Sequence, residues 1–247
     1  MAESYMNYKL KIDYHTHTIY SHGKGTIEDN ARAAREKGLL GLGITDHGPG
    51  HLLYGLNAQK IKNMRMDIDK LKEDVRNPEI YLSIEANIIG TGKCLEFGDV
   101  DPGDFDFIIA GYHYGARGGY GFRNFIHKFL KLKPREQSRQ MIRNTDMIIK
   151  AVYENQIKIL THPGDKGPFD LFEIAKACAE KGTLLEISDR HEYLSVEGIR
   201  QTAATDVKYV VNSDAHTPKE VGSCSRGIKR AVLAGLDIDR IVNLEKY

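Results

Sequence analysis

The sequence predicts an α/β fold of the barrel type, in which parallel strands alternate with helices. Short apolar runs alternate with longer helical patterns from one end of the chain to the other, the order expected when crossover helices join parallel strands. A length of 247 residues fits one domain of this kind. We therefore expect residues 1–247 to form a single domain, without an internal repeat or a linker.

Seven short runs are predicted to be strands. The run at residues 105–112 is apolar at nearly every position, which is typical of a strand covered by side chains inside and by helices outside. The seven predicted strands span residues 9–14, 40–45, 80–86, 105–112, 157–161, 183–187 and 209–212.

Helical patterns lie between these runs. Thr26 and Asp29 resemble a capping box, Ile27 and Ala31 follow at helical spacing, and Gly38 supplies a C-terminal stop. The first two strands and this helix therefore specify one βαβ unit. Further helices are expected at about residues 58–75, 136–155, 169–180 and 219–234.

Composition limits the classes of function. The formal net charge of +1 gives no global basic field for binding nucleic acid. The three cysteines, Cys94, Cys178 and Cys224, form no C-x-x-C pair, which fits a reducing compartment. The N-terminus lacks the order of a signal peptide, and no apolar run approaches the ~20 residues of a membrane helix. We expect a cytoplasmic protein without a membrane anchor; the sequence carries no signature of an oligomeric state.

Potential metal ligands recur at the ends of six of the predicted strands. His15 and His17 are two residues apart, so their side chains leave the same face of a strand and can reach a common metal. An isolated histidine is more often a hydrogen-bonded structural residue, but recurrence at six strand ends argues against coincidence. The predicted ligands are His15, His17, His22, His47, Glu85, His113, His162, Asp214 and His216.

This mixture of imidazole nitrogens and carboxylate oxygens suits zinc, manganese or iron and does not suit calcium. Glu85 follows an apolar run, so we expect its carboxylate to lie where that strand emerges, and its two oxygens can bridge two cations. Asp46 can orient a ligand or accept a proton, and capping of the local backbone is the competing interpretation.

At these residues the chain resembles the PHP (polymerase and histidinol phosphatase) family of metal-dependent phosphoesterases, and in particular its small bacterial stand-alone phosphatases. The resemblance runs from His15 to His216 and is carried by the segments at residues 44–49, 84–87, 108–113 and 213–216. It implies a distorted (β/α)7 TIM-like barrel, in agreement with the seven strands counted independently.

The resemblance also implies a trinuclear site of divalent transition metals, with zinc as the first choice and manganese or iron as alternatives. Glu85, Asp214 and His216 are the expected catalytic residues. The implied ligand groups are His15, His17, Glu85 and Asp214 for the first metal; Glu85, as a bridge, with His113 and His162 for the second; and His22, His47 and His216 for the third.

The predicted function is hydrolysis of a small phosphomonoester by a metal-activated water. No Gly-x-Ser-x-Gly motif points to a covalent intermediate. A phosphodiesterase or nuclease is the first alternative, because residues 114–134 are basic and aromatic, although the net charge makes nucleic acid a less favoured partner. A non-catalytic metal-binding module is the second, and the complete ligand motifs argue against it.

Basic residues near strand ends are candidates for binding the substrate. Arg190 is preferred because a guanidinium can grip two phosphate oxygens; the others are Lys24, Lys93, Arg117 and Lys166. Residues 114–134 are expected to form a lid or substrate-binding loop, or alternatively a solvated excursion or oligomer contact. The remaining histidines, His51, His127 and His191, are expected at the surface or on the substrate side.

Overall fold

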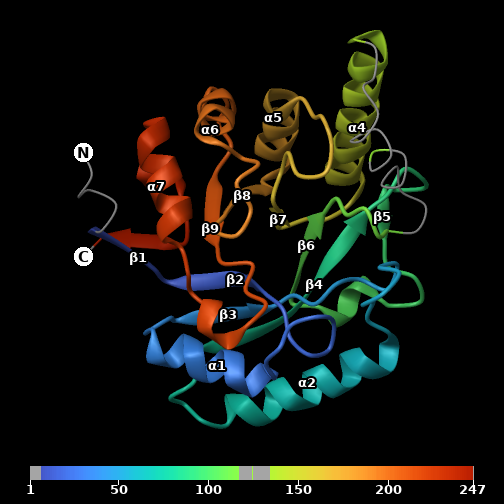
Figure 1. Cartoon of the computed structure of the whole chain (residues 1–247). Coiled ribbons are helices and arrows are strands. Elements are labelled where there is room, and N and C mark those ends of the chain that lie inside the picture. Colours follow the sequence, from blue (N-terminus) through green and yellow to red (C-terminus); the bar gives the residue numbers. More distant parts are fainter. Residues whose placement is uncertain (1–6, 117–123, 125–133, 247) are drawn as a thin grey trace.

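The computed structural model describes residues 7–116, 124 and 134–246 and shows a nearly closed barrel of seven parallel strands (Figure 1). The strands are β2 Ile12–Thr16, β3 Gly41–Ile44, β4 Glu79–Ile88, β6 Phe107–Gly111, β7 Ile159–Leu160, β8 Leu184–Ser188 and β9 Tyr209–Asn212, hydrogen-bonded in that order. An isolated parallel bridge between Thr16 and Ala215 links the two edges. The predicted α/β barrel is confirmed, and each of the seven predicted strands overlaps one of these.

Helices surround the barrel, with α1 and α2 on one side and α4, α5, α6 and α7 on the other (Figure 1). The Thr26 hydroxyl accepts a hydrogen bond from the backbone N–H of Asp29 at 3.1 Å, and the Asp29 carboxylate accepts one from the backbone N–H of Thr26 at 3.0 Å, so the predicted capping box is present. The helices are α1 Ile27–Glu36, α2 Ala58–Lys72, α4 Pro134–Glu154, α5 Leu171–Lys181, α6 Val196–Ala203 and α7 Ser225–Ala234.

Two layers of apolar side chains hold the barrel. The larger lies between strands and helices and includes Leu82 of β4 and Met64 of α2, both fully buried. A smaller cluster joins Ile109, Ile159 and Val210 of β6, β7 and β9. Ile109 pairs with Glu85 in the β4–β6 register, so the two side chains point to the same side of the sheet. This smaller cluster is therefore the apolar floor beneath the polar end of the barrel.

Several boundaries differ from the prediction. The run at residues 9–14 is divided at Lys11: β1 (Tyr8–Leu10) pairs with the C-terminal strand β10 (Leu244–Lys246), and only β2 enters the barrel. The predicted helix at residues 219–234 begins at Ser225, after a 3₁₀ turn at Pro218–Glu220. Helix α6 and the short β5 (Leu95–Glu96), which pairs with the end of β4, were not predicted.

Most of the predicted loop at residues 114–134, including Arg117 and His127, lies outside the described residues. Among the helices that the structure describes, none combines the length and the apolar character needed to cross a bilayer. All three cysteines are free.

Candidate metal centre

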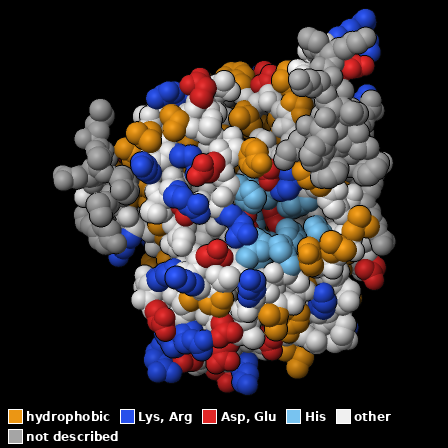
Figure 2. Space-filling view, in the orientation of Figure 1, with side chains coloured by type: hydrophobic (Ala, Val, Ile, Leu, Met, Phe, Trp, Pro, Cys, Tyr) orange, Lys and Arg blue, Asp and Glu red, His pale blue; other side chains and the backbone are white. Residues whose placement is uncertain are grey.

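The nine predicted ligands come together at one end of the barrel, beyond the carboxyl ends of the strands. Figure 2 shows histidine side chains gathered in a hollow with acidic side chains beneath them. The hollow is a cavity of about 420 Å³, lined among others by His22, His47, His113, His162 and His216. Residues from six separate segments thus meet because parallel strands present their carboxyl ends at the same face.

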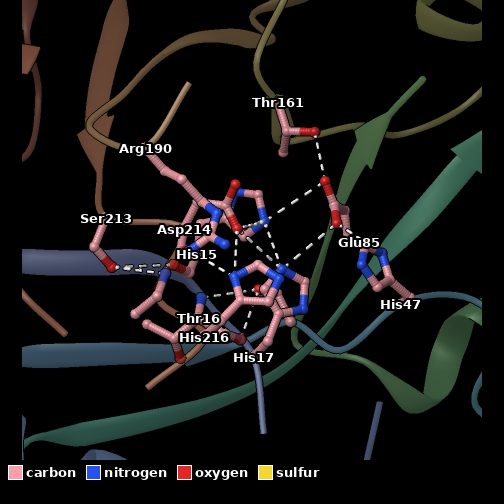
Figure 3. A network of polar contacts seen from close by, with 12 residues as sticks. His15, Thr16, His17, His47, Glu85, Thr161, Arg190, Ser213, Asp214 and His216 are labelled. Atoms are coloured by element: carbon pink, nitrogen blue, oxygen red, sulfur yellow. Dashed lines mark hydrogen bonds and ion pairs between the residues drawn. The ribbon is translucent and has the colours of Figure 1, made fainter. Parts of the chain in front are cut away.

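Glu85 is the centre of this cluster (Figure 3). Its Oε1 lies 2.9 Å from Nε2 of His162 and 3.3 Å from Nε2 of His113. Its Oε2 lies 2.9 Å from Nδ1 of His47 and 3.6 Å from Nε2 of His17. The two oxygens therefore face different imidazoles, as a bridging carboxylate requires.

The expected position of Glu85 at the end of its strand was wrong. Strand β4 continues to Ile88, and Glu85 lies within it. The neighbouring β3 ends earlier, where Ile44 pairs with Leu82, and only an isolated bridge joins His47 to Glu85. Glu85 therefore lies beyond the end of β3, level with the bridge to His47, and this places its carboxylate beside the site.

A second buried glutamate, Glu186 of β8, was missed in the sequence. Its Oε1 accepts hydrogen bonds from Nδ1 of His15 at 2.8 Å and from Nδ2 of Asn212 at 2.9 Å. Its Oε2 accepts one from the backbone N–H of His162 at 2.7 Å. A carboxylate on Nδ1 fixes the ring orientation and leaves Nε2 free to bind a metal. The available signal was a lone acidic residue inside an apolar strand.

His15 and His17 direct their free nitrogens to one point. Their Nε2 atoms are 3.1 Å apart, and Nε2 of His17 is 3.3 Å from Oδ1 of Asp214. Nitrogens bound about 2.0–2.1 Å from one tetrahedral zinc are separated by about 3.3 Å. The spacing of these side chains therefore fits a shared divalent ion.

Two of the nine residues have unusual backbone conformations. His162 has a φ of 29° and Asp214 a φ of 52°, in the left-handed region that most side chains avoid. Buried Asp13 anchors the turn before Asp214, since it accepts hydrogen bonds from the backbone N–H of Ser213 at 3.1 Å and that of Gly222 at 2.8 Å. Backbone strain of this kind persists where surrounding contacts impose it, and it is concentrated at functional sites.

Asp46 caps the local backbone, one of the two interpretations open from the sequence. It accepts hydrogen bonds from the backbone N–H groups of Thr18 at 2.9 Å and Ser21 at 3.1 Å. These bonds fold the segment that carries His22 back over the barrel. The ring of His22 then lies 4.7 Å from that of His47 and 4.1 Å from that of His216, centroid to centroid.

The described residues contain three groups of potential ligands, and within each group the ligand atoms all lie within 4.8 Å of one another. They are His15, His17 and Asp214; His17, His22, His47 and His216; and His47, Glu85 and His113. The implied partition differs from these groups in four respects. His17 is added to the His22 group and His47 to the Glu85 group, whereas Glu85 is missing from the His15 group and His162 from the Glu85 group. The groups thus overlap through shared residues and form one continuous cluster.

The electrostatics of the cluster favour cations. Burial lowers the pKa of His17 and of His113 well below the usual value, which maintains the neutral imidazole that binds metals. Burial opposes ionisation of Glu85, but His113, His15 and His47 outweigh it and hold its pKa well below the usual range. Asp214 behaves likewise, because His15, His17 and His191 overcome its burial.

Several buried ligand atoms have no hydrogen-bond partner within the described part of the chain. They are Nδ1 of His17, of His22, of His47 and of His162, and Oδ1 of Asp214. Nδ1 of His47 is close to Glu85 but makes no hydrogen bond with acceptable geometry. An unpaired buried polar atom is costly. Bound cations would satisfy part of this set, so the residues fit a divalent metal.

Two predicted basic residues, Arg190 and Lys166, line the cavity. Arg190 is paired with Glu220 at 3.6 Å, and Lys166 with Asp165. Lys24 and Lys93 do not line it, and Arg117 is outside the described residues. His51 and His191 also line the cavity, and Nε2 of His191 lies 3.1 Å from Oδ2 of Asp214.

Comparison with known proteins identifies the family. The model of the PHP domain matches residues 13–194. The chain belongs to the PHP family. A probable phosphatase of Thermoanaerobacter sp. (strain X514) is 30% identical over 96% of this chain and 91% of its own length. A probable phosphatase of Shewanella sp. (strain MR-4) is 27% identical over 94% and 86%.

The PHP barrel is also found among solved structures. The histidinol phosphate phosphatase of Lactococcus lactis, complexed with zinc, L-histidinol and phosphate, is similar with a TM-score of 0.62. Its sequence identity is 18%, and the match covers 92% of this chain and 94% of that one. This likeness supports the fold. The family and the phosphatase relatives make the present PHP protein a hydrolase of the phosphoesterase type.

Proposed function

We propose that the protein hydrolyses small phosphomonoesters at a trinuclear centre of divalent metals, with zinc as the preferred ion. We also propose that the whole chain acts as one domain in the cytoplasm. The proposed ligands are those implied by the sequence: His15, His17, Glu85 and Asp214; Glu85, His113 and His162; and His22, His47 and His216.

The observation that carries this proposal is the position of Glu85 among five imidazoles. Besides its four contacts with His17, His47, His113 and His162, its Oε1 is 3.5 Å from Nε2 of His15. A single buried carboxylate has two oxygens for five rings. Nδ1 of His47 lies 2.9 Å from Oε2 and still lacks a hydrogen-bond partner among the described residues, so the cluster needs a further partner. Divalent cations on both sides of Glu85 would supply it.

Metals bound here would neutralise phosphate oxygens and lower the pKa of a bound water toward neutrality. The protein's own groups would position the ester. The side chain of Arg190 is 40% exposed at the mouth of the cavity, and its guanidinium can hold two phosphate oxygens. Lys166 adds a second positive charge on the same cavity.

The family supports this proposed substrate class, and hydrolysis tests it. The Lactococcus structure contains L-histidinol and phosphate, so histidinol phosphate is the first substrate to try, followed by phosphotyrosine and by sugar and nucleotide phosphates. The described part of the cavity mouth offers no observation that favours a diester.

The test is phosphate release from a panel of monoesters and diesters, with metal-loaded and chelator-stripped protein side by side. We expect turnover of monoesters that disappears on stripping and returns with zinc or manganese, together with a metal content near three per chain. Activity on diesters alone would replace the proposal with the nuclease alternative. Stoichiometric metal without hydrolysis of any ester would favour the non-catalytic module.

A further inference from the structure

Arg190 lies in a short connection, residues 188–191, whose backbone is bonded to helix α7. The guanidinium of Arg230 on α7 donates from Nη2 to the backbone carbonyl of Ser188 and to that of His191, the latter at 3.1 Å. Nε and Nη1 of Arg230 are buried and make no hydrogen bond within the described part of the chain. The carbonyls on either side of Arg190 are therefore the groups that this guanidinium holds.

The first turn of α7 holds the beginning of the same connection through Asp189. Its buried carboxylate accepts hydrogen bonds from the backbone N–H of Gly227 at 2.8 Å and from Nε of Arg226 at 3.4 Å. The backbone N–H of Asp189 donates to the carbonyl of Asn212 at the end of β9, at 2.8 Å. The connection is thus fixed before Arg190 by several bonds, whereas after it the bond from α7 comes from Arg230.

Helix α7 reaches the connection because residue 227 is glycine. A Cβ at this position would lie 2.9 Å from Cγ1 of Val211 and 3.1 Å from the carbonyl oxygen of Ile187. Contacts this short would push the helix away from the strands. Arg230 follows Gly227 by three residues and leaves the same face of the helix. The close approach therefore brings its guanidinium to the end of β8.

Cys224 and Arg230 have the spacing of a cysteine nucleophile and a phosphate-binding arginine, but their surroundings do not suit these roles. A cysteine nucleophile must ionise, whereas burial, with Asp189 and Asp13 adding to it, raises the pKa of Cys224 to about 12. The chain enters helix α7 at Ser225, directly after this cysteine. The guanidinium of Arg230 is engaged with backbone carbonyls, so its role is to hold the chain.

The direction of the Arg190 side chain depends on this backbone. Arg190 lines the cavity, and Figure 3 shows its side chain pointing toward Asp214. Its Nη1 lies 3.6 Å from Oε1 of Glu220, and both side chains are partly exposed. A long contact between exposed charges holds a side chain weakly. The position of the Arg190 backbone therefore decides how well its guanidinium faces the metal centre.

We propose that Arg230 is a positioning residue: by holding the carbonyls of Ser188 and His191, it orients Arg190 toward a phosphoryl group bound at the metal centre. This inference rests on the proposed phosphatase function and adds to it a residue of α7 that does not line the cavity. A binding group displaced by about 1 Å loses much of its effect. Arg230 should therefore matter for phosphate binding only while Arg190 is present.

A double-mutant cycle on phosphate binding tests this dependence. Calorimetry measures the affinity of the metal-loaded protein for inorganic phosphate in the unaltered protein, in Arg190→Ala, in Arg230→Ala and in the double variant. Arg230→Ala should weaken phosphate binding about 5-fold in the unaltered background and not measurably in the Arg190→Ala background. An equal loss in both backgrounds, or no loss in either, would overturn the inference.

Variants of similar size show whether the donor itself is responsible. Arg230→Lys keeps a charged donor that can reach one carbonyl, so it should recover part of the lost affinity. Arg230→Met fills the same space without a donor and should bind phosphate as weakly as Arg230→Ala. If Arg230→Ala does not fold, Arg230→Met takes its place in the cycle. Full affinity in Arg230→Met would also overturn the inference.

Arg240→Ala is the matched control for loss of stability. Arg240 also grips backbone carbonyls, those of Ala203 at 2.8 Å and Val207 at 3.2 Å. Val207 precedes β9, so these bonds lie at the opposite end of the barrel from the site. Arg240→Ala should lower the urea midpoint and leave phosphate affinity unchanged. A loss of affinity equal to that in Arg230→Ala would assign both effects to general destabilisation and refute positioning.

Phosphate binding separates this inference from the phosphatase proposal, because the cycle requires no turnover. Coupling between Arg190 and Arg230 would support positioning even if no ester is hydrolysed. Independent effects of the two substitutions would refute it even if hydrolysis succeeds.

Discussion

Replacing Glu186 by glutamine should loosen the metal centre without touching any proposed ligand. The substitution keeps the size of the side chain but exchanges one acceptor oxygen for a donor NH₂ group. Glu186 serves three donors, the ring of His15, the side chain of Asn212 and the backbone N–H of His162. A glutamine oriented to satisfy His15 and Asn212 therefore places its NH₂ against the backbone N–H of His162.

The size of the effect can be worked out from these bonds. A buried donor left without an acceptor costs about 1–3 kcal/mol, so the free energy of unfolding of the metal-free protein should fall by about that amount. Loss of a partner that orients a metal-binding histidine reduces metal affinity about 10- to 100-fold. Urea unfolding measures the first quantity, and zinc competition against a chelator measures the second.

The same chemical change on the surface provides the control. Glu197 of α6 has a side chain that is 67% exposed, so Glu197→Gln should change neither stability nor zinc affinity. If Glu186→Gln bound zinc as tightly as the unaltered protein and unfolded at the same urea concentration, Glu186 would not position His15 and His162, and the reasoning would be refuted.

Three further predictions concern the same site. The metal-free protein should lose stability as the pH falls below ~6.5, because burial lowers the pKa of His22 to about 3 and that of His51 to about 4, so that the unfolded chain binds more protons than the folded one. His15, whose pKa is raised, acts in the opposite sense. Urea midpoints at pH 7.5 and pH 5 measure the net effect. His22→Ala should lower the metal content by one ion per chain while the other two ions remain, as measured by atomic absorption. Loss of all metal would contradict the proposal that His22 binds only the third metal. Arg190→Ala should lower kcat/KM for monoesters about 10-fold or more through loss of a charged hydrogen bond, whereas Arg200→Ala on α6 should not; unchanged kcat/KM would remove Arg190 from substrate binding.

Local patterns were enough to predict the barrel strands. A strand such as β9, at Tyr209–Asn212, was predicted with the observed bounds because its apolar run is short and sharply bounded. Helix α6 was missed because it has only eight residues and contains Gly198, whose position next to the Leu171 side chain leaves little room for a larger residue. A glycine inside a short helix removes the signal on which a sequence pattern depends.

The pairing of β1 with β10 also could not be predicted from the sequence. Tyr8 and Lys246 are partners from the two ends of the chain, and neither three-residue strand is long enough to show a period of two. The predicted run at residues 9–14 therefore joined β1 to β2, although the chain changes partners between them.

The sequence by itself determined the barrel and the positions of the proposed ligand residues, because both depend on runs of apolar residues and on the polar residues next to the end of each run. Only the tertiary structure decided how these residues meet: that Glu85 faces five histidines, that Glu186 supports His15 across 171 positions of sequence, and that Arg230 holds the backbone on either side of Arg190. The physical reason is that burial periodicity is a local property of the chain. Which carboxylate faces which imidazole depends on strand order, register and strand length, and these are fixed only when the barrel closes.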